Sequence, residues 1–438
     1  MVFICLFPTL MSTLVCRVVT TPQLYGKITV AVTMSSVHPC ARALVRWRSR
    51  QLQHTLAWRL QNSMPSNAFS TSSVLSGNRA IVYDTNGDPA RVLSAFSFPD
   101  LPPPPPNTVN IRLLLAPINP ADINVIEGVY PAKPEPDVSL SQAKDHPLFV
   151  GGNEGLGKVM AIGDGVVGLR KDDWVVMTKA QSGTWSSAKN VALSDVLKVP
   201  KQGLSEAQAA TITVNPPTAY NMLHDFAQLV EGDWIVQNGA NSAVGQAVIQ
   251  IAAAKGYKTI NFIRDREDVK SLKQHLESLG ATHVVTYDEL SDKSFRAKIK
   301  TWTVGKDIRL GLNCVSGETT TVMARLLGNN AHLVSYGAMS KAPLSLPTSL
   351  FIFKNLTCHG FWQSRWYSDK SLEQRQELLE TLTALMRDGK LQSPNHEILT
   401  IGGTESDVSA SEKIRDLVAR LGQGMYGKKV LLRVEETA

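Results

Sequence analysis

The feature that most constrains this chain is a strand–turn–helix–strand pattern in residues 233–266. Residues 234–236 form a short apolar run of the kind found in buried strands, and the small-residue turn 238–242 follows it. A helical pattern then ends at Gly256, and a second apolar run begins at residue 259. This order predicts a βαβ unit of a parallel sheet, with an anion-binding site at the N-terminus of its helix.

The turn indicates which anion that site binds. Ala240, Ser242 and Gly245 stand where a full G-x-G-x-x-G fingerprint has glycines, so the motif alone is weak, although small residues still admit a pyrophosphate. NAD-selective sites place an acid about twenty residues further on, whereas this chain has Arg264 and Arg266 there. Two guanidinium groups suit a 2′-phosphate, so the sequence predicts NADPH. The alternative is a generic α/β unit with a basic surface turn.

The net charge of +7 comes from the N-terminal segment. No Asp or Glu precedes Asp84, and from that residue onwards 37 basic residues are balanced by 38 acidic ones. The body of the protein is therefore near neutral, and we expect no nucleic-acid partner.

The N-terminal segment itself, residues 1–77, is rich in Arg and Ser and has the composition of a mitochondrial transit peptide. Residues 41–60 can form an amphipathic helix, and residues 63–76 resemble a processing region, so we expect import into the mitochondrial matrix. A secretory signal in residues 1–19 is the alternative, but it lacks a positive n-region and is too short to span a membrane. Met34 is an alternative start.

Short strands and Gly-rich turns dominate the chain after residue 79, and this pattern predicts a partly open β-barrel. After Arg266 strands and helices alternate, which predicts a doubly wound parallel sheet. Two later apolar runs, 350–353 and 357–362, are expected to return to the first domain. The two cysteines of the body, Cys314 and Cys358, lie in apolar runs, so we expect buried thiols in a reducing compartment.

Several motifs occur in an order that resembles the medium-chain dehydrogenase/reductase superfamily, and within it the mitochondrial enoyl-thioester reductases. The resemblance covers nearly all of the chain after about residue 78. The general motifs are N-P-A-D-I-N from Asn119, G-G-N-E-G from Gly151 and N-P-P-T-A-Y from Asn215; the more specific ones are E-G-V-Y from Glu127, R-D-R from Arg264, L-N-C-V from Leu312, Y-G-A-M from Tyr336 and G-F-W from Gly360.

The resemblance implies an α/β protein with two domains. We expect a GroES-like, partly open β-barrel catalytic domain from residues 78–215 and 360–438, and a Rossmann-type NADPH domain from residues 216–359. The implied reaction is the NADPH-dependent reduction of trans-2-enoyl thioesters, carried on acyl carrier protein or coenzyme A, in mitochondrial fatty acid synthesis. The family usually forms homodimers.

The same comparison argues against a metal. Zinc-dependent relatives carry His and Cys ligands and a four-Cys lobe, whereas this chain has Asn153 at the His position, no Cys in the loop before Asn119 and no such lobe. Substrate polarisation must then come from protein donors. Beside Asn153, Glu154 is expected to tie the Gly-rich turn to its neighbours.

Tyr130 is the candidate proton donor. Hydride addition at Cβ of a 2-enoyl thioester leaves negative charge on the thioester oxygen, and a phenol with a pKa of about 10 is protonated at neutral pH and can donate to it. From the residues alone, a loop tyrosine is more often a half-buried surface residue. In the reductases that the chain resembles, the tyrosine at this place is the catalytic donor, and we expect the same of Tyr130.

Cofactor contacts are expected at the helix N-terminus, at the ends of three strands and at one C-terminal lysine. Phe361 and Trp362 could equally be core aromatics, and Lys428 a solvated charge. The implied set is Asn215, Asn241, Ser242, Ala243, Val244, Arg264, Asp265, Arg266, Tyr336, Gly337, Ala338, Met339, Phe361, Trp362, Gln363 and Lys428.

Two other functions remain open at this point. A quinone or small enone reductase would share the fold, and the setting of Tyr130 argues against it. An NADPH-occupied interaction protein, such as a nuclear-receptor partner, would have incidental catalysis, and the acid-free leader argues against it.

Overall fold

The computed structural model describes residues 2–3, 16–17, 77–144, 146–292, 294–423 and 428–438. The chain divides into two compact units, residues 1–71 and 72–438. In the first unit the described residues form an antiparallel pair, β1 (Val2–Phe3) and β2 (Cys16–Arg17). The leader helix expected at 41–60, the processing region and Met34 lie outside the described residues. None of the described helices has both the length and the apolar character that a membrane crossing requires.

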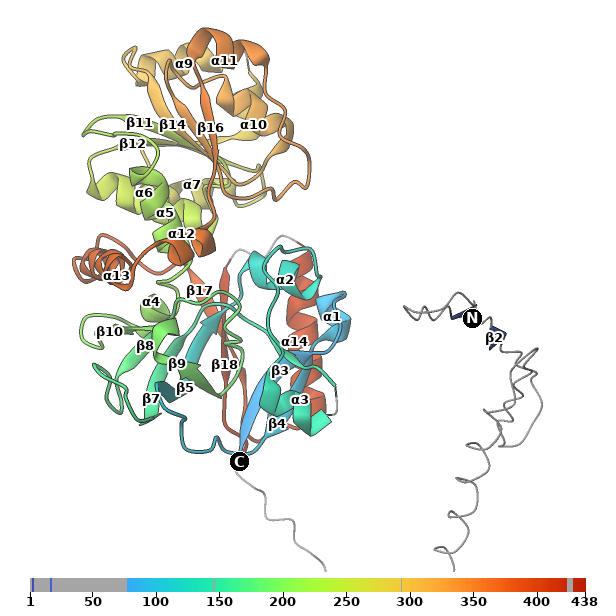
Figure 1. The fold of residues 1–438 in the computed structure, drawn as a ribbon. Helices are drawn as coiled ribbons and strands as arrows, with labels where there is room; N and C mark the ends of the chain where they lie inside the picture. Colours follow the sequence, from blue (N-terminus) through green and yellow to red (C-terminus); the bar gives the residue numbers. More distant parts are fainter. Residues whose placement is uncertain (1, 4–15, 18–76, 145, 293, 424–427) are drawn as a thin grey trace, which may run out of the picture. The chain divides into compact units, whose positions relative to one another are not determined.

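A six-stranded parallel sheet forms one half of the second unit, in the order β13-β12-β11-β14-β15-β16 (Figure 1). Alternate residues of its central strand face two different cores, because side chains alternate along a strand. Ile235 packs in a core with helix α6, whereas Trp234 and Val236 pack on the opposite face with residues of α9, α10 and α11. The sheet is therefore doubly wound, as predicted.

The strands of this sheet are β11 (Trp234–Gln237), β12 (Lys258–Ile263), β13 (His283–Thr286), β14 (Ile308–Asn313), β15 (His332–Ser335) and β16 (Thr357–Gly360). The helices between and beside them are α5 (Asn215–His224), α6 (Ala243–Ala254), α7 (Val269–Ser278), α8 (Tyr287–Ser291), α9 (Phe295–Trp302), α10 (Gly317–Ala324) and α11 (Thr348–Lys354).

A mainly antiparallel sheet of seven strands, with a smaller sheet of three, forms the other half. The larger sheet runs β10-β8-β7-β5-β18-β17, with β9 also paired to β5, and β10 and β17 do not pair with each other. The smaller sheet has the order β4-β3-β6. Among the described residues the strands thus do not close into a ring, which confirms the partly open barrel.

The strands of these two sheets are β3 (Asn78–Tyr83), β4 (Ser94–Phe98), β5 (Thr108–Pro117), β6 (Phe149–Val150), β7 (Leu156–Ile162), β8 (Trp174–Met177), β9 (Ala188–Ala192), β10 (Val196–Val199), β17 (His396–Ile401) and β18 (Lys429–Val434). The remaining helices are α1 (Pro89–Val92), α2 (Pro120–Ile126), α3 (Val138–Lys144), η2 (Leu193–Asp195), α4 (Glu206–Ala210), α12 (Gln363–Asp369), α13 (Leu372–Arg387) and α14 (Asp407–Gly422).

Two expectations for residues 350–362 are wrong. Residues 350–353 lie in α11, and β16 pairs in parallel with β15, so this segment completes the six-stranded sheet before the chain leaves it. Cys358 is exposed, not buried, because β16 is the edge strand. Cys314 is buried as expected.

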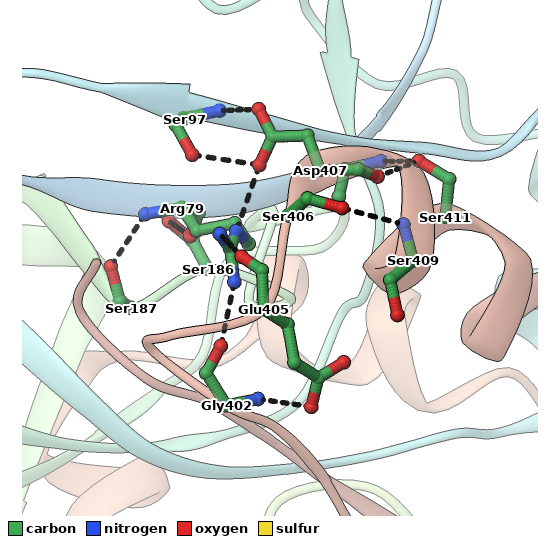
Figure 2. A network of polar contacts seen from close by, with 11 residues as sticks. Arg79, Ser97, Ser186, Ser187, Gly402, Glu405, Ser406, Asp407, Ser409 and Ser411 are labelled. Atoms are coloured by element: carbon green, nitrogen blue, oxygen red, sulfur yellow. Dashed lines mark hydrogen bonds and ion pairs between the residues drawn. The ribbon is translucent and has the colours of Figure 1, made fainter. Parts of the chain in front are cut away.

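A buried arginine ties the first strand of the folded body to its C-terminal helix (Figure 2). The side chain of Arg79 is 3% exposed, and its Nε lies 2.9 Å from Asp407 Oδ1. Its two terminal nitrogens donate to the carbonyl oxygens of Gly402 and Glu405. The carboxylate of Asp407 also accepts from the backbone and hydroxyl of Ser97 on β4. One side chain therefore fastens β3 to the segment where α14 begins.

Candidate active site

A cavity of about 170 Å³ brings together residues from both halves of the second unit. Seven of the residues predicted from the sequence line it, although they are far apart along the chain. They are Tyr130, Asn215, Val244, Tyr336, Phe361, Trp362 and Gln363. The other predicted cofactor residues lie outside this cavity: Asn241, Ser242, Ala243, Arg264, Asp265, Arg266, Gly337, Ala338, Met339 and Lys428.

The loop that carries Tyr130 is held by the end of helix α2. Gly128 adopts a left-handed conformation with φ of 80°, which favours glycine just past a helix end. The amide of Asn86 donates to the carbonyl oxygens of Val125 and Ile126 and so satisfies the exposed end of the helix. A Cβ on Gly128 would come within 3.0 Å of the Asn86 side chain. The loop geometry before Tyr130 is therefore fixed by local contacts.

The hydroxyl of Tyr130 acts as an acceptor in one hydrogen bond, which leaves its proton free to be donated in another. The indole Nε1 of Trp362 donates to it across 2.8 Å, and the two rings meet edge to face with centroids 6.1 Å apart. Because an indole N–H can only donate, the Tyr130 oxygen accepts this bond, and its own proton stays available for another partner. Burial and the nearby Asp122 raise the pKa of Tyr130, while the Trp362 bond lowers it; the net direction is upward. Tyr130 is thus protonated at neutral pH.

The turn after β11 has the geometry of a dinucleotide-binding turn. Ser242 is the N-cap of α6, and its hydroxyl accepts from the backbone N–H of Gly245 across 3.1 Å. A Cβ on Gly245 would lie 2.5 Å from the carbonyl oxygen of Ala240, so only glycine allows this close approach. The first backbone N–H groups of α6 form an anion site beside Val244, and this donor set fits the diphosphate of NADPH.

The arginines expected to bind a 2′-phosphate follow directly after β12. Arg264 and Asp265 are exposed. Arg266 is partly buried and makes a two-point ion pair with Asp268, with Nη2 lying 3.1 Å from Oδ2. Arg264 thus lies on the surface, and Arg266 would have to leave its carboxylate partner in order to bind a phosphate.

The segment after β15 is packed against the strand next to it. The N–H of Met339 donates to the carbonyl oxygen of Cys314, and a Cβ on Gly337 would lie 3.2 Å from that same oxygen. The Tyr336 hydroxyl is buried beside the side chains of Cys314 and Ser242. Burial, as the largest cause, raises the pKa of Tyr336 well above its ordinary value. Tyr336 therefore lines the cavity as a protonated phenol.

Glu154 ties the Gly-rich turn to its neighbours, as expected. It is 1% exposed and accepts from the amide of Asn119 at 3.1 Å and from the backbone N–H groups of Thr213 and Val214 at 2.9 and 2.8 Å. Its oxygens are therefore committed to the protein. Burial is the main cause that raises its pKa.

The residues around this turn do not suit zinc. The side-chain oxygen of Asn153 accepts from the backbone N–H of Gln181 across 2.6 Å, and an amide is a poor zinc ligand. Within the described ranges no three His, Cys, Asp or Glu side chains gather as a metal site would require. The donor set therefore does not fit the zinc of related dehydrogenases.

Several cavity residues were missed from the sequence. Thr178, Lys179, Thr213 and Tyr367 line the cavity through contacts that only the tertiary structure creates. A further group, Asn119 and its partner Lys429, could have been found from strand alternation. The exposed Lys428 precedes β18, and one residue further Lys429 turns inward to bond with Asn119.

The fold and the site define a class of protein. Residues 105–220 match the alcohol dehydrogenase GroES-like domain family, and residues 243–383 match the zinc-binding dehydrogenase family. The Escherichia coli quinone oxidoreductase complexed with NADPH superposes with a TM-score of 0.65 at 22% identity over 81% of this chain and 99% of that one, a likeness of fold. The chain is a member of the medium-chain dehydrogenase/reductase class.

More similar proteins narrow the class. The chain is 42% identical over 355 residues to the mitochondrial enoyl-[acyl-carrier-protein] reductase of Yarrowia lipolytica, covering 81% of this chain and 92% of the relative. It is 41% identical over 372 residues to the Homo sapiens protein of the same name, covering 84% and 95%. The mitochondrial 2-enoyl thioester reductase Etr1p/Etr2p heterodimer from Candida tropicalis superposes with a TM-score of 0.75 at 37% identity, covering 82% and 99%. The chain belongs to the mitochondrial enoyl-[acyl-carrier-protein] reductase family.

Proposed function

We propose that the chain reduces the carbon–carbon double bond of trans-2-enoyl thioesters with NADPH, in mitochondrial fatty acid synthesis. The observation that carries the proposal is the hydrogen bond from Trp362 to Tyr130 at the wall of the cavity. It leaves a protonated phenol as a donor in a cavity that is also lined by Val244 at the start of α6 and by Tyr336 just after β15. A solved relative, Etr1p, was determined as a complex with NADP and crotonyl-CoA at 36% identity and a TM-score of 0.75.

The roles of the residues follow from this arrangement. Bound NADPH supplies the hydride that Cβ receives. Tyr130 donates its hydrogen bond to the thioester oxygen, where negative charge develops, and assists protonation of Cα. Trp362 keeps the phenol oxygen occupied, so the phenol proton points to the substrate.

The cofactor site is proposed from the sequence and supported by local geometry. The N-terminus of α6, with Asn241, Ser242, Ala243 and Val244, would hold the diphosphate, and Arg264 and Arg266 the 2′-phosphate. Asn215, residues 336–339 and residues 361–363 would contact the nicotinamide half, and Lys428 a phosphate. Asp265 lies between the two arginines and would orient them.

The rival functions are less well supported. The likeness to quinone reductases is one of fold, at 22% identity, whereas the enoyl reductases are 41–42% identical over most of the chain. An interaction protein would not need a phenol held as a donor at the wall of a cavity.

The test is steady-state oxidation of NADPH by the purified protein with enoyl-CoA substrates of graded chain length and with a quinone. The proposal expects turnover with the enoyl-CoA series and little with the quinone. Turnover of the quinone alone would replace it with the rival reductase function.

Two finer points belong to the same proposal. The carrier of the physiological substrate would be acyl carrier protein, for which the relatives are named, with coenzyme A thioesters also accepted. The relatives' mitochondrial names support a mitochondrial location, and the acid-free leader favours the matrix. Import assays with a C-terminally tagged chain test this point.

A homodimer is supported by the free edge of the parallel sheet. Strand β16 is the last in the sheet order, and its neighbour α11 exposes three large apolar side chains. Phe351, Ile352 and Phe353 are 40%, 67% and 78% exposed. An exposed edge strand beside an apolar surface favours pairing with a second copy. Sedimentation of the Ile352→Lys variant, which should shift the protein towards monomer, tests the surface.

We also infer the division into domains. Residues 1–77 would be the leader, residues 78–215 and 360–438 the catalytic domain, and residues 216–359 the NADPH domain. In support, all strands of the parallel sheet lie between residues 234 and 360, and all strands of the two antiparallel-rich sheets lie outside that range.

A further inference from the structure

A lysine with two nearby carboxylates lies behind the wall of the cavity. Lys429, the first residue of β18, donates from Nζ to the backbone carbonyl oxygen of Ile118 at 2.8 Å and to Asn119 Oδ1 at 2.5 Å. The carboxylates of Asp122 and Glu154 are 2% and 1% exposed, and their charges favour the protonated form of Lys429. Burial acts in the opposite sense and lowers the pKa of Lys429. Lys429 is therefore the cation that faces two buried acids.

The neighbours of Asn119 define the orientation of its amide. Its oxygen receives two donors, Lys429 Nζ and the amide nitrogen of Asn215, the second at 3.3 Å. Its nitrogen donates to Glu154 Oε2 at 3.1 Å. If the Asn119 amide were reversed, its nitrogen would face the two donors Lys429 and Asn215, and its oxygen would face the Glu154 carboxylate. All three hydrogen bonds would then be lost. The amide is locked by a cation on one side and an anion on the other.

Asn215 connects the fixed amide of Asn119 to the ligand-binding groups of the cavity. Asn119 and Asn215 both line the cavity, and Asn215 is 9% exposed. With one N–H of Asn215 committed to Asn119, the side-chain carbonyl and the second N–H are left for a ligand. Reversal of the Asn119 amide would repel the Asn215 N–H and turn that side chain, so the groups offered to a ligand depend on Lys429.

We propose that Lys429 is a positioning residue for the cofactor: it holds the Asn119 amide, and through it Asn215, in the orientation in which the cavity binds NADPH. This positioning role depends on the proposed function in one respect: it assumes that the cavity is the NADPH site. It assigns no contact between Lys429 and the cofactor.

The test is the dissociation constant of NADPH, measured by fluorescence titration of the full-length chain. Lys429→Met should weaken NADPH binding by about tenfold, or about 1.4 kcal/mol. The matched control is Lys413→Met, because Lys413 makes the same kind of contacts away from the cavity: its Nζ donates to the Thr400 carbonyl at 2.7 Å and to Glu405 at 2.8 Å. The control should lower the melting temperature and leave NADPH affinity within about twofold. NADPH affinity in Lys429→Met equal to that of the control would overturn the proposal.

A second variant keeps the test informative if Lys429→Met does not fold. In Glu154→Gln the one remaining side-chain oxygen would accept the hydrogen bonds from the backbone N–H groups of Thr213 and Val214. The new amide nitrogen would then face the amide nitrogen of Asn119, and that hydrogen bond would be lost. NADPH binding should again weaken by about tenfold, with Lys429 intact. Unchanged affinity would overturn the proposal. Where both variants fold, the double variant Lys429→Met/Glu154→Gln should show less than the sum of the two losses, because both act on one amide.

The NADPH-binding measurements on Lys429→Met can be interpreted independently of whether the proposed reaction is correct. Wild-type protein that binds NADPH but does not reduce enoyl-CoA would refute the proposed reaction, while a weakened Lys429→Met variant would still support the positioning role. Normal wild-type turnover with unchanged NADPH affinity in Lys429→Met would refute the positioning role alone.

Discussion

The indole nitrogen of Trp362 donates a 2.8 Å hydrogen bond to the hydroxyl of Tyr130, although 232 residues separate the two in the chain. Tyr130 lies just beyond α2, and Trp362 lies between β16 and α12. The bond lies at the wall of the cavity and determines which atom of the phenol is a donor.

Trp362→Phe should lower kcat by about tenfold, because one hydrogen bond of about 1–1.5 kcal/mol no longer fixes the phenol. The ring contact with Tyr130 would remain. Steady-state kinetics with an enoyl-CoA substrate measure the effect. Trp366→Phe, a tryptophan within α12 that does not line the cavity, is the control and should leave kcat unchanged. Equal kcat values for the two variants would contradict the role of the indole N–H.

Arg264→Ala combined with Arg266→Ala should raise the KM for NADPH by about 100-fold and that for NADH far less, since each charge-assisted bond contributes about 1.5–3 kcal/mol. Only NADPH carries the 2′-phosphate. Asp268→Asn is the matched control: it releases Arg266 from its ion pair and should lower the KM for NADPH or leave it unchanged. Equal losses for both cofactors in the double variant would refute the phosphate assignment.

Arg79→Met should lower the free energy of unfolding by about 3 kcal/mol, because it leaves Asp407 without its cation and two carbonyl oxygens without donors. KM values should not change, since Arg79 does not line the cavity. Urea denaturation measures the loss. The control is Arg91→Met, whose ion pair with Asp88 joins side chains that are 86% and 56% exposed and should contribute less than about 0.5 kcal/mol. Similar losses in both variants would show that the network in Figure 2 is not the main tie.

Asp122 gives the protein a defined pH dependence of stability. Burial, as the largest cause, raises the pKa of Asp122 to about 7 from its ordinary value of 3.8. Below pH 3.8 both the folded and the unfolded chain hold this proton. As the pH rises towards 7 the unfolded chain releases the proton and the folded chain keeps it, so the contribution of Asp122 to stability falls over that window.

In Asp122→Asn this decline should be absent. Between pH 4 and pH 7 the free energy of unfolding of the wild-type protein should therefore fall by at least about 1 kcal/mol more than that of the variant. Chemical denaturation at several pH values measures it. Asp288→Asn, at an exposed position, is the control and should follow the wild-type profile. An unchanged pH profile in Asp122→Asn would show that Asp122 ionises normally in the folded protein.

Local patterns predicted much of the fold, and long-range contacts account for most of what was missed. The strand–turn–helix–strand unit at 233–266 was recognisable because each element is encoded by adjacent residues. Residues 350–362 were misplaced because a short apolar run fits a helix, a buried strand or an edge strand equally well. The exposure of Cys358 was missed because the position of its strand at the edge of the sheet is a tertiary property.

The candidate site shows the same division. Tyr130 and the residues after β15 and β16 were predicted from motifs, and the structure brings several of them to one cavity. The bond between Trp362 and Tyr130 depends on how the segment after β16 packs beside the distant loop after α2. No pattern within either segment encodes that contact.

The most direct test of the account is the Tyr130→Phe variant, with kcat measured as NADPH oxidation on crotonyl-CoA and NADPH affinity measured by fluorescence. Removal of the donor hydroxyl should lower kcat by at least about 100-fold, while the dissociation constant for NADPH stays within about twofold of the wild-type value. A variant that turns over at the wild-type rate would contradict the assignment of Tyr130 as the proton donor.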